Sequence, residues 1–213
     1  MRLSLFLLSL LISSSVEADH NPTVRRHSRA RAFIELQCHK TLYPDLCIRY
    51  LSYYVTNFTN TLSHQKLAQI ALKVSLDRAE STRAYVTDVA KELKLNKANY
   101  YYYQAIRECL DQINDGVAQL SNCMRETQMI KENGGSDGHD FPWHASNVQT
   151  WMSAALTDAS MCIIDGFSGR AIGGKTKALL KAKVLNLEQT TSISLALFNR
   201  FAARYKSSHH NKP

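Results

Sequence analysis

The chain contains little that would interrupt a helix. Its four prolines in 213 residues stand at Pro22, Pro44, Pro142 and the last position. Because proline breaks a helix interior, the long proline-free stretches between them are free to be helical. The sequence also has no convincing run of alternating apolar and polar residues, the pattern of a half-buried strand. These two absences argue against a β-rich or α/β fold.

Motifs that carry known chemistry are also missing. There is no G-x-S-x-G elbow and no H-E-x-x-H helix, and the eight histidines are scattered. No zinc-finger, homeodomain or RRM signature accompanies the basic charge, so nucleic acid is not the expected partner. No segment reaches the run of about 20 apolar residues that spans a bilayer. We therefore expect no enzyme activity, no metal or other cofactor and no membrane span.

One stretch imitates a nucleotide-binding loop. Residues 169–176, GRAIGGKT, fit the pattern G-x-x-x-x-G-K-[ST]. A P-loop needs a strand that feeds the glycine-rich turn and a helix that follows it. The segment before this match is helical in pattern, so we interpret it as an interhelical loop.

The N-terminal sequence predicts secretion. Arg2, the apolar run 3–12 and the small-residue site ending at Ala18 form a signal peptide, residues 1–18. There is no KDEL-type retention sequence at the other end. Residues 19–31 are expected to be a flexible basic leader and residues 206–213 a disordered tail. Asn57 begins the one N-x-[ST] sequon, so it is the expected glycosylation site.

The formal charge of +8 limits the partners. A secreted basic protein favours acidic surfaces, such as a polyanionic polysaccharide or an acidic protein.

The apolar residues recur with the period of a helix. Four long helices are predicted at about 63–94, 99–131, 147–165 and 175–205, with Ser146 and Gln149 as a capping box for the third. Short connections make neighbouring helices antiparallel, which predicts an all-α, up-down-up-down four-helix bundle over 63–205. Residues 32–60 are expected to form an N-terminal helical hairpin, broken near Tyr43-Pro44. Residues 32–205 would then be one domain.

The five cysteines predict disulfides, because the compartment is oxidising. Cys109 and Cys123 lie on one helix about 21 Å apart and cannot bond each other. Antiparallel pairing across a turn at residues 133–142 puts Cys109 level with about residue 166 and Cys123 level with about residue 152. Cys162 is therefore predicted to bond Cys109, with Cys123 a free thiol.

Cys38 and Cys47 enclose eight residues, in the stretch CHKTLYPDLC. A zinc site would need further ligands at suitable spacing, and no redox C-x-x-C is present. Because the other cysteines are assigned, these two are left to bond each other and pin the hairpin.

These features together resemble the plant invertase and pectin methylesterase inhibitor family. The marks are the signal peptide, the C-x8-C pair, Cys109 before an acidic helix, and WMSAALTDASMCIIDGF around Cys162. The last stretch is similar to the family's W-[LV]-S-A-A-L-T-x-x-x-T-C-x-D-G-F. The resemblance covers about residues 32–205 and implies a four-helix bundle with an N-terminal hairpin and two disulfides.

The resemblance also implies a function. The chain lacks the Pro-Lys-Phe tripeptide that invertase inhibitors carry after the second bundle helix, and WMSAALTD is more like the pectin methylesterase branch. It would form a stoichiometric 1:1 complex over the pectin-binding cleft of a pectin methylesterase in the apoplast, or cell wall. The positions that match the family's contacts are Asp111, Asp115, Thr157 and Asp158. Met161 stands where the family usually has Thr.

Other interpretations remain open at this point. The chain could inhibit invertase through the same fold, or it could be a cell-wall module that binds acidic pectin through its basic ends. For Asp111 and Asp115 the plain alternative is a solvated helix face. A secreted enzyme with an unrecognised site is the least favoured class.

Overall fold

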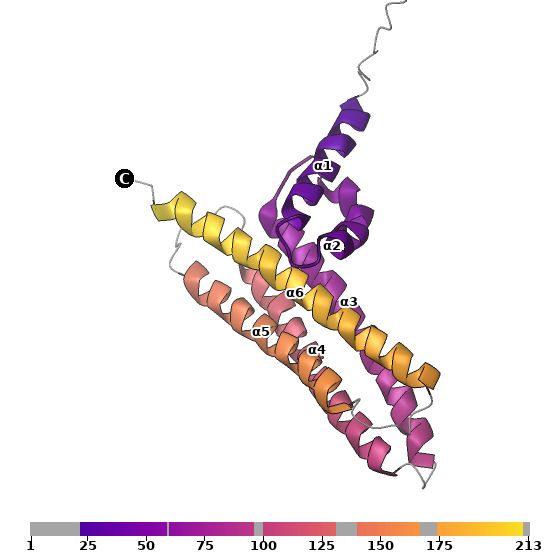
Figure 1. Ribbon diagram of the computed structural model, residues 1–213. Coiled ribbons are helices and arrows are strands. Elements are labelled where there is room, and N and C mark those ends of the chain that lie inside the picture. Colours follow the sequence, from indigo (N-terminus) through magenta and orange to yellow (C-terminus); the bar gives the residue numbers. More distant parts are fainter. Residues whose placement is uncertain (1–21, 59, 96–99, 131–139, 167–173, 211–213) are drawn as a thin grey trace, which may run out of the picture.

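The structure, a computed structural model, describes every residue except 1–21, 59, 96–99, 131–139, 167–173 and 211–213. In the described residues all regular elements are helices, as expected from the sequence (Figure 1). In chain order they are α1 (Pro22–Cys38), α2 (Pro44–Leu51), the 3₁₀ helix η1 (Ser52–Phe58), α3 (His64–Leu95), α4 (Tyr100–Met129), α5 (Phe141–Gly166) and α6 (Gly174–His210).

The four long helices form the predicted four-helix bundle. Helix α3 packs on α4 and α6, and α5 packs on the same two helices. The seam between α3 and α6 therefore lies across the bundle from the seam between α4 and α5. The shorter helices α1, α2 and η1 pack against one another beside one half of the bundle, as the expected hairpin (Figure 1).

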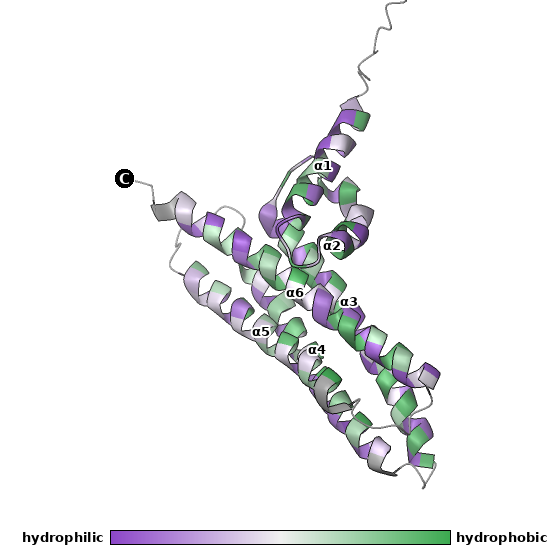
Figure 2. Ribbon diagram, in the orientation of Figure 1, coloured by the Kyte–Doolittle hydropathy of each residue, from purple (hydrophilic) through white to green (hydrophobic). Residues whose placement is uncertain are grey.

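The core consists of apolar side chains that recur at the helical spacing predicted from the sequence. Figure 2 shows each long helix with hydrophilic and hydrophobic residues alternating around its axis. On α4 the side chains of Ile106, Ile113 and Leu120 are fully buried, at helical spacing, and Leu180 and Val184 do the same on α6. Burial of such side chains stabilises a fold by about 1.5–3 kcal/mol each. The periodicity in the sequence was therefore sufficient to find the buried face of each bundle helix.

Helix α5 begins earlier than the sequence predicted. Its first residue is Phe141, so Ser146 and Gln149 lie inside the helix and form no capping box. Gln149 instead donates a hydrogen bond to the side chain of Asn199 at 2.7 Å. Proline is tolerated in the first turn of a helix, where its missing N–H is not needed, so Pro142 does not stop this one.

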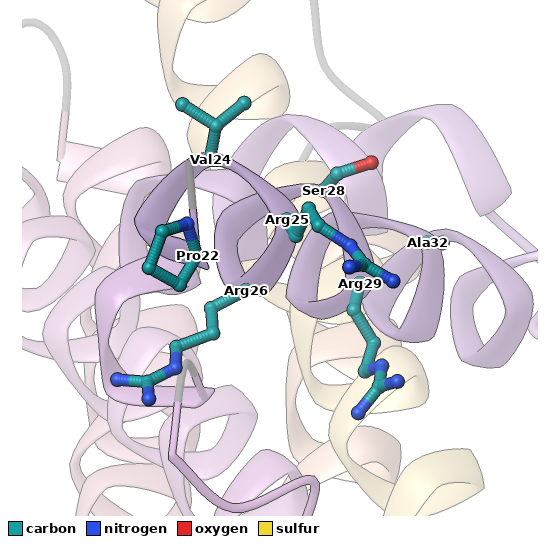
Figure 3. A pocket seen from close by; sticks show the side chains of 7 residues that line it. All are labelled: Pro22, Val24, Arg25, Arg26, Ser28, Arg29 and Ala32. Carbon is teal, nitrogen blue, oxygen red and sulfur yellow. The ribbon is translucent and has the colours of Figure 1, made fainter. Parts of the chain in front are cut away.

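The flexible leader predicted at residues 19–31 and the disordered tail predicted at residues 206–213 are helical in the parts that the structure describes. Residues 22–31 are helical and belong to α1, and α6 continues to His210. Arginine and alanine are good helix formers, and Pro22 occupies the first position, where it is compatible with a helix. Arg25, Arg26 and Arg29 line a hollow along these first turns (Figure 3).

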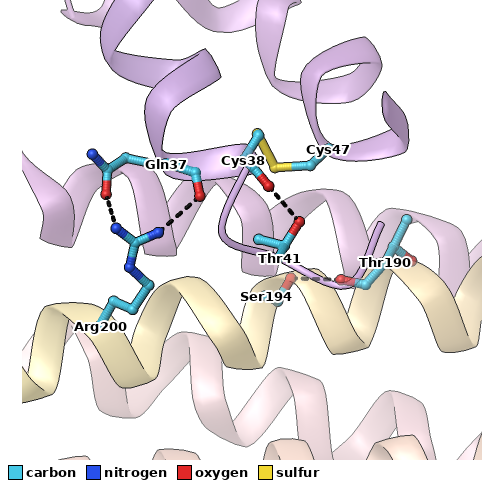
Figure 4. Close-up of a disulfide and its surroundings, with 7 residues drawn as sticks. All are labelled: Gln37, Cys38, Thr41, Cys47, Thr190, Ser194 and Arg200. Carbon is cyan, nitrogen blue, oxygen red and sulfur yellow. Dashed lines mark hydrogen bonds between the residues drawn. A yellow bond between two sulfur atoms is a disulfide. The ribbon is translucent and has the colours of Figure 1, made fainter. Parts of the chain in front are cut away.

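A disulfide joins the two helices of the hairpin, and hydrogen bonds hold the hairpin on the bundle. The predicted Cys38–Cys47 disulfide joins α1 to α2, and both cysteines are fully buried. Thr41 donates to the main-chain oxygen of Cys38 at 2.8 Å in the turn between them. Across the boundary, Arg200 of α6 bonds Gln37 of α1 (Figure 4). The hairpin is therefore held at a fixed place on α6.

Candidate protein-docking surface

The predicted disulfide between Cys109 and Cys162 is present. It joins α4 to α5 with a Cα–Cα distance of 4.4 Å, and both cysteines are buried. Cys123 is a buried free cysteine, as predicted. The bridge lies close in the chain to the residues predicted to contact a partner protein. It closes a loop that spans 53 positions. In the chain-entropy model such a loop stabilises the fold by about 4 kcal/mol.

Gly116 marks the close approach of α4 to α5. A Cβ atom added there would lie 3.8 Å from the main-chain oxygen of Ala155 and 3.9 Å from Cβ of Asp158. These are ordinary van der Waals distances, but they leave no room for a larger side chain. The small residues on α5 at Ala155 and Ala159 are buried in the same contact region. The surface residues on either side of the seam are therefore held close together.

Two of the proposed carboxylates meet across this seam. Asp115 of α4 is exposed and Asp158 of α5 is partly buried. Burial raises the pKa of Asp158, and the negative charge of Asp115 raises that pKa further. Asp111 lies one turn from Asp115 on α4 and is exposed. The three carboxylates thus form an acidic strip along the seam.

Between Ser146 and Met161, the side chains of α5 that are exposed carry hydroxyl groups, except for Met161 itself, and none of them is charged. Thr157 and Met161 are exposed one turn apart, and Met161 keeps 41% of its surface accessible. The face continues toward the start of the helix through Ser153, Thr150 and Ser146. Thr157 donates to the main-chain oxygen of Ser153 at 3.1 Å, which fixes the position of its hydroxyl group. The five proposed contact residues therefore share one surface, which we call the α4–α5 face.

The charge of the chain is divided between opposite seams. Helices α4 and α5 together contain two Arg, no Lys and six Asp or Glu. Helix α6 contains seven Lys or Arg and one Glu. A protein of net positive charge thus presents an acidic α4–α5 face, which suits a partner with hydrogen-bond donors or cations.

The structure also contains a polar cluster near the start of α5 that was not predicted from the sequence. One carboxylate oxygen of Glu126 accepts bonds from Nδ1 of His144 at 2.8 Å and from the amide of Asn147 at 2.7 Å. Burial raises the pKa of Glu126, but the bonds from Asn147 and His144 and the charge of His144 outweigh it and lower that pKa overall. Next to the cluster, Trp143 is 68% exposed. Only the spacing of His144 and Asn147 on one side of a helix could have hinted at this cluster.

The other sites that the sequence suggested are a glycosylation site and a nucleotide-binding loop. Asn57 is exposed at the end of η1, which suits a glycan, although Thr59 of its sequon lies outside the described residues. Most of the G-x-x-x-x-G-K-[ST] match also lies outside them, and the described part before it is helical. Across the described chain, no three metal-ligating side chains come together in a way that could hold an ion. None of its helices is both long and apolar enough to cross a membrane.

Comparisons with known proteins agree with this architecture. A family model for the plant invertase/pectin methylesterase inhibitor matches residues 32–197. The chain is 40% identical over 197 residues to pectinesterase inhibitor 9 of Arabidopsis thaliana, covering 92% of this chain and 93% of that protein. It is 37% identical over 204 residues to pectinesterase inhibitor 11 of the same plant, covering 95% and 96%. In fold it is similar to a crystal structure of a mutant pectin methylesterase inhibitor from Arabidopsis, with a TM-score of 0.57, 19% identity and coverage of 76% and 92%. The chain therefore belongs to the plant invertase/pectin methylesterase inhibitor family.

Proposed function

We propose that this protein inhibits a pectin methylesterase by docking its α4–α5 face over the enzyme's pectin-binding cleft in a 1:1 complex. The observation that carries the proposal is the similarity to two named pectinesterase inhibitors over more than nine tenths of each chain. The family is one of proteins that inhibit enzymes, and in this role the chain does no catalysis itself.

The geometry supports the α4–α5 face as the docking surface. The Cys109–Cys162 disulfide and the close contact at Gly116 hold the two helices rigidly, so little conformational freedom is lost on binding. The face offers carboxylates at Asp111 and Asp115 and an exposed apolar side chain at Met161. A rigid surface that mixes apolar and hydrogen-bonding groups is typical of protein interfaces.

Docking through carboxylates would make the complex depend on pH and salt. The raised pKa of Asp158 means that it begins to take up a proton at a higher pH than an ordinary aspartate. If the face binds donors or cations of the enzyme, affinity falls as pH drops through that raised pKa, and it falls with added salt. Unchanged binding between about pH 5 and pH 7.5, and between low and high salt, would contradict this mechanism.

The place of action is the apoplast. Residues 1–18, outside the described residues, form the proposed signal peptide, and Asn57 is the proposed glycosylation site. Two disulfides agree with folding in an oxidising compartment. An affinity for acidic pectin would retain the inhibitor in the cell wall.

Inhibition of invertase is the second candidate, because the family description names both targets. The absence of Pro-Lys-Phe after the second bundle helix argues against it. Both candidates are tested by adding the purified protein to a pectin methylesterase and to an acid invertase and measuring the activity of each. Inhibition of the esterase alone is expected, and inhibition of the invertase alone would overturn the proposal.

Variants on the α4–α5 face test the docking mode. Thr157→Arg should weaken esterase inhibition by at least about tenfold, because a buried unpaired cation costs more than 1.4 kcal/mol at an interface. Ala203→Arg, at an exposed position of α6, is the matched control and should inhibit normally. Met161→Thr, which restores the residue usual in the family, should strengthen inhibition. Equal inhibition by Thr157→Arg and Ala203→Arg would place the interface elsewhere.

A further inference from the structure

A groove on the opposite side of the bundle is lined by two cationic side chains and three polar ones. We infer that the seam between α3 and α6 binds the carboxylate of an acidic sugar unit in a polyuronate chain. This inference rests on the proposed function in one respect, since a pectin methylesterase acts on such a polymer and leaves free carboxylates along it.

The groove is formed by two well-packed helices. It has a volume of about 280 Å³ and is lined by Arg78, Ser81 and Thr82 of α3 and by Ala182, Lys183 and Asn186 of α6. Small ligand sites in proteins begin at about this size. A groove of this volume suits one sugar ring of a longer chain better than a whole helix of a protein partner.

The polar groups at the groove are mainly hydrogen-bond donors. Arg78 and Lys183 supply one cation from each helix, and Ser81 supplies an exposed hydroxyl. The amide oxygen of Asn186 accepts a bond from the hydroxyl of Tyr50 at 3.0 Å. That bond leaves the amide N–H₂ of Asn186 as a further donor. A set of donors around a guanidinium matches a carboxylate flanked by hydroxyl groups.

Both cations are held in position by tyrosine rings. The guanidinium of Arg78 lies 4.8 Å from the ring centre of Tyr50, and the ammonium of Lys183 lies 5.2 Å from that of Tyr85. Such contacts between a cation and the face of an aromatic ring are attractive, also at exposed sites. They also restrict the long side chains, so less entropy is lost when an anion binds.

Acidic side chains do not neutralise the groove. In the described part of the chain, no carboxylate lies within 4.0 Å of the charged nitrogens of Arg78 or Lys183. Asp77, the neighbour of Arg78 in sequence, pairs with Lys73 at 3.2 Å. The two cations therefore remain available to an external anion.

The position of the groove separates it from the proposed docking surface. The α3–α6 seam lies across the bundle from the α4–α5 face, and α6 contributes seven Lys or Arg and one Glu to that side of the molecule. One molecule can therefore contact an enzyme through one seam and a polyanion through the other. In this arrangement the inhibitor stays attached to demethylated pectin near its target.

The binding test uses the purified inhibitor without any enzyme. Binding to trigalacturonate is measured by calorimetry, and retardation by polygalacturonate is measured in native gels. The double variant Arg78→Gln/Lys183→Gln should bind at least about tenfold more weakly, because two charge-assisted contacts are lost. The control Arg83→Gln/Lys181→Gln removes the same charge from the same helices outside the groove and should bind within about twofold of the original protein.

Several results would overturn the inference. An equal loss in both double variants would show non-specific attraction to a basic protein, and equal binding of fully methyl-esterified trigalacturonate would show that the carboxylate is not recognised. Self-association that only the groove variant abolishes in sedimentation, without binding of trigalacturonate, would assign the groove to the acidic face of a second copy. Esterase inhibition is measured in parallel. Normal inhibition without galacturonate binding would contradict this inference and leave the proposed function intact. Galacturonate binding without inhibition would contradict the proposed function and leave this inference intact.

Discussion

Arg200 of α6 makes two hydrogen bonds to Gln37 of α1, a residue 163 positions away in the chain. Its Nη1 donates to the main-chain oxygen of Gln37 at 2.8 Å, and its Nη2 donates to the side-chain Oε1 at 2.7 Å. Gln37 is only 3% exposed, so these groups have little access to water as an alternative partner. The pair fixes the hairpin to the bundle beside the Cys38–Cys47 disulfide.

Loss of this pair should loosen the hairpin. Arg200→Ala leaves the buried Oε1 of Gln37 without its donor, so the free energy of unfolding should fall by about 2 kcal/mol. Arg200→Lys keeps the charge but cannot make two parallel bonds. Its free energy of unfolding should therefore lie between those of the original protein and of Arg200→Ala. Urea denaturation gives the stability, and hydrogen exchange over residues 33–51 reports the hairpin. Exchange that stays unchanged in Arg200→Ala would show that the pair does not hold it.

Gly116 should accept one methyl group and nothing larger. Gly116→Ala places a Cβ at van der Waals distance from Ala155 and removes a poor helix former, so stability should rise by up to about 1 kcal/mol. Gly116→Leu overpacks the contact between α4 and α5 and should cost about 1–3 kcal/mol. Ala118→Leu, at an exposed position of α4, is the control and should change little. If Gly116→Leu unfolds with the same free energy as the original protein, α4 and α5 can move apart at this contact without loss of stability.

The Glu126 cluster should stabilise the protein only above acid pH. A carboxyl whose pKa is lowered in the folded state contributes stability above its unfolded pKa and loses it as pH falls through the folded pKa. Glu126→Ala should therefore lower the free energy of unfolding by about 2 kcal/mol at about pH 7, and by much less at about pH 3. Glu108→Ala, exposed on the same helix, is the control. Urea denaturation at both pH values measures the difference, and an equal cost at both would contradict it.

Cys123 should be unreactive while the protein is folded. Burial raises the pKa of its thiol to about 12, with the charge of Glu126 adding to the effect. The thiol also lies 3.5 Å from the main-chain oxygen of Val148. Because the thiolate is the reactive form, labelling with a thiol reagent should be at least about a hundredfold slower than for free cysteine. Denaturation without reductant should expose one reactive thiol per chain, and three or five would show that one or both disulfides have not formed.

Local patterns in the sequence predicted the helices and the disulfides. Apolar spacing identifies the buried faces, because a helix must bury the side that repeats every 3.6 residues. The levels of Cys109, Cys123 and Cys162 across an antiparallel pair were enough to select the partner of Cys162. The start of α5 was wrong, because Ser146 and Gln149 match a capping pattern while the chain before them is already helical. A cap motif is a local signal and cannot exclude an earlier start.

By itself the sequence determined the all-α class, the order of the bundle helices and which cysteine stays free, since each depends on spacing along one helix or one hairpin. Only the tertiary structure decided which polar and charged side chains meet. It placed Asp115 beside Asp158, Arg200 on Gln37, and Arg78 near Lys183 across a groove. Those contacts depend on the rotation of each helix about its axis and on the shift between neighbours, which are set by packing of the whole core rather than by any one segment.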